Sequence, residues 1–211
     1  MRGLKILVVV AAMLAADAAA ACEPGETGLP VLDLSVVTWH LGHDETATLL
    51  VVPDGSGAPL TAARRPDGSP VDATIQLTLI DACYDPIAHY PREDMWLESV
   101  DQGLVLCAGG SIADHNTDLQ GMTTWSQPIR GGGHSVAGCK VVVSGTLSFP
   151  LPLRFNSPDL NGDLAVSLVD VARFAGAYFG PYRFEADLRA DGALNLSDIA
   201  VMAAHVGADC P

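Results

Sequence analysis

The C-terminal part of the sequence contains a duplicated pattern of aspartate and asparagine residues, and this repeat constrains the fold more than any other feature. The first copy begins at Asp159 and the second at Asp187, an offset of 28 residues (187 − 159). Counted from each first aspartate, oxygen-bearing side chains stand at positions 1, 3, 5, 9 and 12 in the first copy, and at 1, 5, 9 and 12 in the second. Each copy runs into an apolar stretch with helical spacing, 171–179 and 199–206. A single Asp/Asn cluster is usually a turn, but two spaced copies predict a repeated loop-helix unit.

The spacing of these oxygens fits a calcium loop. Calcium takes about six to eight oxygen ligands, so a tight loop must turn alternate residues inward around one point. Position 7 would add a backbone carbonyl, and position 9 a direct or water-mediated oxygen. We therefore predict two calcium sites, and binding of the ion should also fold each loop because unpaired carboxylates repel one another. The expected ligands are Asp159, Asn161, Asp163, Ala165, Ser167 and Asp170 in the first loop, and Asp187, Asp191, Ala193, Asn195 and Asp198 in the second.

The two loops are not equivalent in sequence. In the first, Leu164 stands at position 6, where glycine is usual for the sharp turn, although Gly162 lies nearby. In the second, Arg189 stands at position 3, where it cannot ligate a metal and adds a positive charge. We expect a good first site and a weaker second site.

An EF-hand would have glutamate at position 12 and a helix on both sides of the loop, whereas here position 12 is aspartate and one helix follows each loop. With Ser or Asn at position 9, residues 157–208 resemble the type I dockerin. The resemblance implies that calcium folds the module and that its helix faces bind a cohesin domain on a scaffold or cell-surface protein. Cohesin contacts in that family involve loop positions 10 and 11, which here are Leu168, Val169, Leu196 and Ser197. Because the two pairs differ, equivalent binding in two flipped orientations is not expected. The alternative is that the apolar residues at these positions pack against the preceding β domain, so that the module is an intramolecular cap.

Residues 28–150 have the pattern of an all-β domain. Short runs rich in Val, Ile, Leu and Thr predict strands at 31–39, 46–52, 73–80, 103–107, 122–126 and 140–149. Glycine- and proline-rich clusters between them predict turns at 53–57, 66–70 and 131–133. Strands at this spacing without helical periods between them favour a β-sandwich.

Two segments of this region resemble the bacterial immunoglobulin-like repeats of invasin-type surface proteins. They are the Asp-Gly-Ser-Pro-Val turn at 67–71 and the Thr-Asp-x-x-Gly-x-Thr turn at 117–123. The resemblance covers about residues 30–148. The expected fold is mainly β: an immunoglobulin-like β-sandwich at 22–153, followed by a small α-helical dockerin-like module with two calcium loops at 154–211.

The N-terminus predicts export. Arg2 and Lys5 precede an apolar run at 6–16 and a series of small residues, the pattern of a secretory signal peptide at 1–21. The run is too short to cross a bilayer, so we expect a secreted bacterial protein without a transmembrane segment. Cys22, preceded by Ala19, Ala20 and Ala21, also resembles the lipidated first residue of a bacterial lipoprotein, which would anchor the protein to the cell surface.

The chain has 5 cysteines. In an oxidising exterior, disulfides are the default, and lipidation of Cys22 would leave an even number. Cys107 with Cys139 is the expected pair because both flank a predicted hairpin region, although sequence does not fix connectivity.

The charge balance excludes one class of partner. A formal net charge of -14, from 11 Lys+Arg against 25 Asp+Glu, is opposite to the basic face that binds nucleic acid. An apolar fraction of 49% indicates a globular protein.

No catalytic constellation is recognisable in the sequence. His40 and His43 would lie on opposite faces of a strand, so a zinc site there is disfavoured and a solvated loop is preferred. The acidic residues Glu93, Asp94 and Glu98 near Trp96 are interpreted as a charged loop. The expected function is non-catalytic attachment through the dockerin-like module. The alternatives are a structural or adhesive surface protein, and a glycan-binding or polysaccharide-degrading accessory subunit that uses exposed aromatic residues. The three tryptophans Trp39, Trp96 and Trp125 are the candidates for such aromatic platforms.

Overall fold

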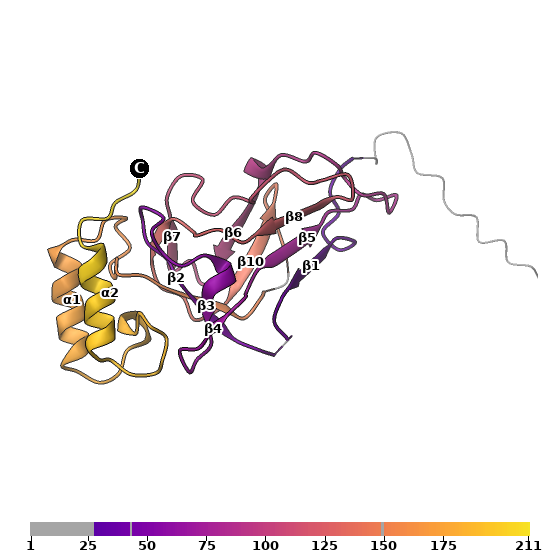
Figure 1. Ribbon diagram of the computed structural model, residues 1–211. Helices are drawn as coiled ribbons and strands as arrows, with labels where there is room; N and C mark the ends of the chain where they lie inside the picture. Colours follow the sequence, from indigo (N-terminus) through magenta and orange to yellow (C-terminus); the bar gives the residue numbers. More distant parts are fainter. Residues whose placement is uncertain (1–27, 43, 149) are drawn as a thin grey trace, which may run out of the picture.

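The computed structural model describes residues 28–42, 44–148 and 150–211. The predicted signal peptide and the proposed lipid-anchor residue Cys22 lie outside these residues, as does His43. Within the described part the chain is mainly β, with two α-helices near the C-terminus (Figure 1). The strands are β1 (Val36–Trp39), β2 (Ala47–Leu50), β3 (Ala63–Arg64), β4 (Pro70–Val71), β5 (Ile75–Thr78), β6 (Met95–Ser99), β7 (Leu104–Leu106), β8 (Met122–Trp125), β9 (Gly131–Gly133), β10 (Cys139–Val143), β11 (Thr146–Leu147) and β12 (Leu153–Asn156). The helices are α1 (Leu168–Tyr178) and α2 (Leu196–His205), and short 3-10 turns cover Leu60–Ala62, Arg92–Asp94 and Phe184–Ala186.

The strands form several small sheets. Among the described residues their orders are β1-β5-β8, β11-β10-β6, β12-β2-β3-β4 and β7-β9. All the pairs are antiparallel except β12 with β2. Because β12 is a member of a sheet, the expected domain boundary between residues 153 and 154 falls inside a strand.

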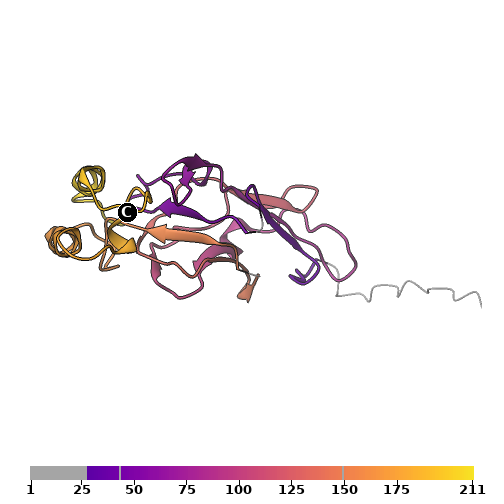
Figure 2. The same ribbon diagram turned by 90° about the horizontal axis from the view of Figure 1, so that it is seen from below.

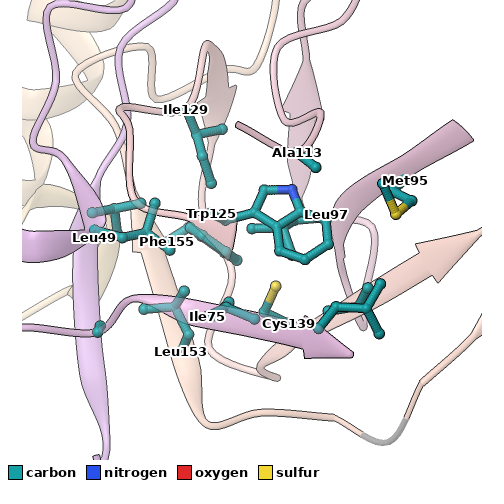
Figure 3. Packing of buried hydrophobic residues seen from close by; sticks show 14 of the residues in the cluster. Leu49, Ile75, Met95, Leu97, Ala113, Trp125, Ile129, Cys139, Leu153 and Phe155 are labelled. Carbon is teal, nitrogen blue, oxygen red and sulfur yellow. The ribbon is translucent and has the colours of Figure 1, made fainter. Parts of the chain in front are cut away.

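The core of the β region is built from alternating residues of several strands. In β5, Ile75 and Leu77 are buried while the two residues that alternate with them are only half-buried, as the period of two in a strand requires. Their neighbours in the same core are Leu97 from β6 and Trp125 from β8. Figure 3 shows Trp125 among these side chains and close to Phe155 of β12. The expectation that Trp125 serves as an exposed aromatic platform is therefore wrong.

A second, smaller core lies between the helices and the loops before them. It contains Phe174 of α1, Met202 of α2, and Leu160 and Leu188 from the loops. Both views place the two helices side by side at one end of the molecule, next to the sheets (Figures 1 and 2). Each helix starts at a capping box, formed by Ser167 with Asp170 in α1 and by Asn195 with Asp198 in α2.

Three local predictions need correction. The glycines at 131–133 form strand β9 instead of a turn, because their missing side chains let backbone approach closely: a Cβ at Gly131 would lie 2.5 Å from the Val105 carbonyl oxygen. The stretch 140–149, expected as one strand, contains β10 and β11 with a turn between them. Of the acidic residues around Trp96, Glu93 and Asp94 lie in a 3-10 turn, but Glu98 lies in strand β6. Met95 and Leu97 of this strand enter the core, and Trp96 and Glu98 alternate with them.

The expected disulfide between Cys107 and Cys139 is also wrong. Cys107 is bonded to Cys210, and Cys139 has a free thiol that is completely buried at the start of β10. Burial raises the pKa of the Cys139 thiol, which keeps it neutral. Cys83 is disulfide-bonded as well. The two cysteines were paired because both flank a predicted hairpin region, but the side chain of Cys139 is buried in the core and Cys107 faces the C-terminal segment.

Candidate metal centre

The first loop brings three of its predicted ligands together. Asp159, Asp163 and Asp170 each offer a carboxylate oxygen, and the three oxygens lie within 4.8 Å of one another. Asp159 and Asp170 are buried, while Asp163 is exposed. Among the described residues, these three aspartates are the one set of three or more His, Cys, Asp or Glu side chains that lie close enough together to share an ion.

Asp159 organises the turn of this loop. Its Oδ1 accepts hydrogen bonds from the backbone amides of Gly162 (2.9 Å) and Asp163 (3.3 Å), and its Oδ2 accepts one from Leu164 (2.8 Å). These amides fold the loop around a single carboxylate. Oδ2 accepts only one hydrogen bond and so keeps a lone pair for a metal, whereas Oδ1 already accepts two.

Asp170, at position 12, closes the loop from the helix side. Its Oδ1 accepts a hydrogen bond from the Asn161 amide (3.2 Å), and its Oδ2 accepts one from the Ser167 amide (2.9 Å). The Ser167 side chain caps α1 by accepting from the Val169 amide (3.1 Å). The side-chain nitrogen Nδ2 of Asn161 donates to Oδ2 of Asp163 (2.7 Å). The predicted ligands of the first loop therefore form one connected cluster.

The electrostatics of the first loop favour a cation. Burial raises the pKa of Asp159, and the negative charges of Asp170 and Asp163 raise it further, against the opposing hydrogen bonds from Leu164 and Gly162. The donors are carboxylate, amide, hydroxyl and carbonyl oxygens, which is the set that a hard cation such as calcium prefers. The donor chemistry of the first loop therefore fits calcium.

The second loop repeats this design with one addition. Asp187 accepts hydrogen bonds from the amides of Asp191 (3.1 Å) and Gly192 (2.8 Å), and Asp198 accepts from the amides of Arg189 (3.0 Å) and Asn195 (2.9 Å). Burial raises the pKa of Asp198, and the charges of Asp187 and Asp191 add to the rise. The Ala193 amide donates to Asp191 (3.1 Å), as the Ala165 amide does to Asp163 (3.2 Å).

The addition is Tyr182, which the sequence reading missed. Its hydroxyl donates to Oδ2 of Asp187 (2.9 Å), and burial together with this hydrogen bond raises the pKa of Tyr182 to about 12. The Tyr182 hydroxyl therefore competes with a metal for one carboxylate of the second loop. The three second-loop carboxylates, all among the described residues, do not come as close together as those of the first. The repeat gave no signal for Tyr182, because the equivalent position before the first loop is occupied by Arg154 and not by a second tyrosine.

The two loops share an uncommon backbone conformation. Positions 4 and 6 have positive φ in both copies: +71° at Gly162 and +69° at Leu164, then +52° at Ala190 and +80° at Gly192. Each loop thus has one glycine and one non-glycine in the left-handed region, in opposite order. The equivalent backbone supports the interpretation of the repeat as two copies of one loop, and it explains how Gly162 and Gly192 share the role expected at position 6.

Both loops lie directly on the β region. A Cβ added at Gly132 of β9 would lie 1.8 Å from Oδ2 of Asp159, and the Gly133 amide donates to the Asp159 carbonyl (2.7 Å). In the second loop, a Cβ at Gly68 would lie 2.8 Å from the Cβ of Asp191, and the side-chain amide of Asn156 donates to the Asp187 carbonyl. The glycines of the β region therefore act as contact surfaces for the aspartate loops, a role that only the three-dimensional structure reveals.

The residues predicted to contact a partner are mostly exposed. Leu168 is 78% exposed and Leu196 is 76% exposed, Val169 is also exposed, and Ser197 is half-buried. They lie at the starts of α1 and α2. Between the two helices there is an apolar groove of about 320 Å³. Its walls are repeat-related residues of the two helices together with Phe179: Val171 and Ile199, Phe174 and Met202, Ala175 and Ala203, Tyr178 and Val206.

Comparison with known proteins adds no family assignment. No protein-family model matches the chain, and a search of curated proteins finds no match. Among the described residues, no helix is both long and apolar enough to cross a membrane.

Proposed function

We propose that this chain is a secreted, non-catalytic protein whose C-terminal module binds calcium at two loops and attaches the β region to a protein partner. The observation that carries the calcium assignment is the cluster of Asp159, Asp163 and Asp170, two of them buried, in a loop that is repeated with the same backbone conformation. Buried carboxylates repel one another, so they require a bound cation or protonation to be stable. All other potential ligands in the cluster carry oxygen, which favours calcium over softer metals.

The proposed fold of the module is that of a type I dockerin, and the proposed partner is a cohesin-type domain. Support comes from the exposed leucines at the starts of both helices and from the apolar groove between the helices. Exposed apolar surface of this kind is characteristic of protein-binding sites. The test is binding of the full chain to a purified type I cohesin domain, measured in calcium and in a chelator. Calcium-dependent binding that Leu168→Asp and Leu196→Asp together abolish supports attachment, whereas absence of binding in calcium overturns it.

A second candidate function is an intramolecular calcium-stabilised cap. It is favoured by the contacts of both loops with Gly132 and Gly68 and by the disulfide that links the C-terminus to Cys107. In that case calcium would raise the thermal stability of the β region, and the chain would bind no cohesin domain. The two functions are separated by measuring both properties on the same preparation.

For the β region we propose an immunoglobulin-like sandwich of the invasin type. Residues of β5 and β8 share one core with residues of β6 and β10, as two facing sheets would. Strand pairing measured by NMR tests this fold, and a pairing that joined these four strands into one continuous sheet would contradict it. Glycan binding has less support, since Trp125 is buried and the indole nitrogen of Trp96 donates to Glu98 (2.7 Å).

A further inference from the structure

The C-terminal segment of the chain pairs with the first loop. The Val166 amide donates to the Ala208 carbonyl (2.8 Å), the Gly207 amide donates to the Val166 carbonyl (2.8 Å), and the Cys210 amide donates to the Leu164 carbonyl (3.3 Å). Together these bonds make a short antiparallel bridge in which Ala165 lies opposite Asp209. The last residues of the chain therefore form a backbone wall along loop positions 6 to 8.

This pairing has a consequence for the carbonyl expected to bind calcium. In an antiparallel bridge whose hydrogen bonds are made by the flanking residues, the central residue directs its own carbonyl away from the partner segment. The bridge engages the carbonyls of Leu164 and Val166, so the carbonyl of Ala165 between them is directed away from the C-terminal segment. That orientation leaves the position-7 ligand free to face the interior of the loop.

The C-terminal segment is itself fixed covalently to the β region. Cys210 forms a disulfide with Cys107, which directly follows β7 and whose amide donates to the Arg130 carbonyl (3.1 Å). β7 pairs with β9, the strand whose Gly132 contacts Asp159. The first loop is thus held between β9 on one side and the C-terminal segment on the other, and both are attached to β7.

The second loop has no such wall. Among the described residues, no β-bridge involves its equivalent positions 192–194. The repeat therefore supplies an internal control, because any effect of the C-terminal segment on metal affinity should be confined to one of two otherwise similar loops.

We propose that residues 207–210, held by the Cys107–Cys210 disulfide, are a positioning element for the first calcium site and set its affinity independently of the second. This inference rests on the proposed calcium function. Without the disulfide the segment can detach, and each binding event must then also order the segment and reform its hydrogen bonds. The loss of roughly one such hydrogen bond corresponds to about a tenfold weaker site.

The experiment measures calcium affinity by calorimetry with the two sites separated. The Asp191→Ala background reports the first site and the Asp163→Ala background reports the second. The double variant Cys107→Ser with Cys210→Ser is introduced into both backgrounds. We expect the first-site dissociation constant to rise about tenfold and the second-site constant to stay within about twofold. Hydrogen exchange of the Val166 and Gly207 amides should accelerate in the same variant.

A second variant keeps both cysteines in case the first does not fold. Gly207 has a φ of +94° and open space around it, so Gly207→Ala strains the segment without a steric clash. It should weaken the first site alone, by a smaller factor. Equal losses at both sites, or no loss at either, in the variant that folds overturn the inference. Absence of calcium binding in the unmodified chain overturns the proposed function instead, and with it this inference.

Discussion

The two aspartate loops have the same backbone and nearly the same side-chain pattern, yet their surroundings differ. The first loop packs Asp159 against the glycine strand β9 and pairs with the C-terminal segment. In the second loop, Asp187 is hydrogen-bonded to Tyr182, and Arg189 replaces the asparagine of the first copy. A ligand pattern alone therefore does not determine a metal site, since neighbouring elements decide which oxygens are available and how rigidly they are held.

The largest expected effect comes from adding a side chain where strand β9 contacts the first loop. Gly132→Ala places a methyl group 1.8 Å from the original position of Asp159 Oδ2, so the loop or the strand must move. We expect the free energy of unfolding to fall by about 3 kcal/mol, the upper part of the usual range for overpacking, and calcium binding at the first loop to weaken. Urea denaturation with and without calcium measures both effects.

Gly176→Ala is the matched control for this substitution. Gly176 lies inside α1 with open space around its Cα, and alanine is the better helix former there. It should raise the free energy of unfolding by up to about 1 kcal/mol. If Gly132→Ala proved as harmless as this control, the first loop would not depend on β9.

Arg189→Asn should make the second loop more like the first. The change removes a positive charge and supplies the side-chain oxygen that position 3 lacks. We expect second-site calcium affinity to increase about tenfold, equivalent to about 1.4 kcal/mol, while first-site affinity stays unchanged. Calorimetric titration in the Asp163→Ala background measures it, and an unchanged second-site affinity would show that Arg189 does not limit this site.

Substitutions at the two positive-φ positions of the second loop test the shared backbone conformation, with smaller expected effects. Ala190 has a φ of +52° and Gly192 one of +80°. Gly192→Ala should lower the free energy of unfolding by about 1 kcal/mol, because a side chain is strained in the left-handed region. Ala190→Gly should raise it by about 0.5 kcal/mol for the opposite reason. Thermal unfolding of the two variants checks the signs, and equal signs would contradict the assigned conformation.

The smallest expected effect is a pH dependence of the metal-free protein. Because the folded-state pKa of Asp159 is raised, this group contributes stability that is present below its unfolded pKa and lost as the pH rises through the folded value. Asp159→Asn removes the charge; its side-chain nitrogen cannot accept a backbone hydrogen bond, but that loss is the same at every pH. Without calcium, the variant should therefore gain stability relative to the original chain between about pH 4 and pH 7. Denaturation at both pH values in a chelator tests the sign, and in calcium the variant should instead be the less stable protein.

Local patterns in the sequence predicted the parts of the fold that depend on local chemistry. The two helices follow from their apolar period, and the clustering of Asp159, Asp163 and Asp170 follows from their spacing. The failures concern long-range contacts. Gly131–Gly133 has turn composition, and it is a strand only because a sheet partner and an aspartate loop occupy the space that side chains would fill. Cys107 pairs with a residue 103 positions away, which no local pattern indicates.

The central claim is that the two loops are calcium sites of unequal affinity. Calorimetric titration of the full metal-free chain with calcium tests it most directly. We predict two binding events per chain, with dissociation constants at or below about 1 mM, the tighter of which disappears in Asp163→Ala and the weaker in Asp191→Ala. Absence of saturable binding at millimolar calcium, or loss of the tighter event in Asp191→Ala, would contradict the account.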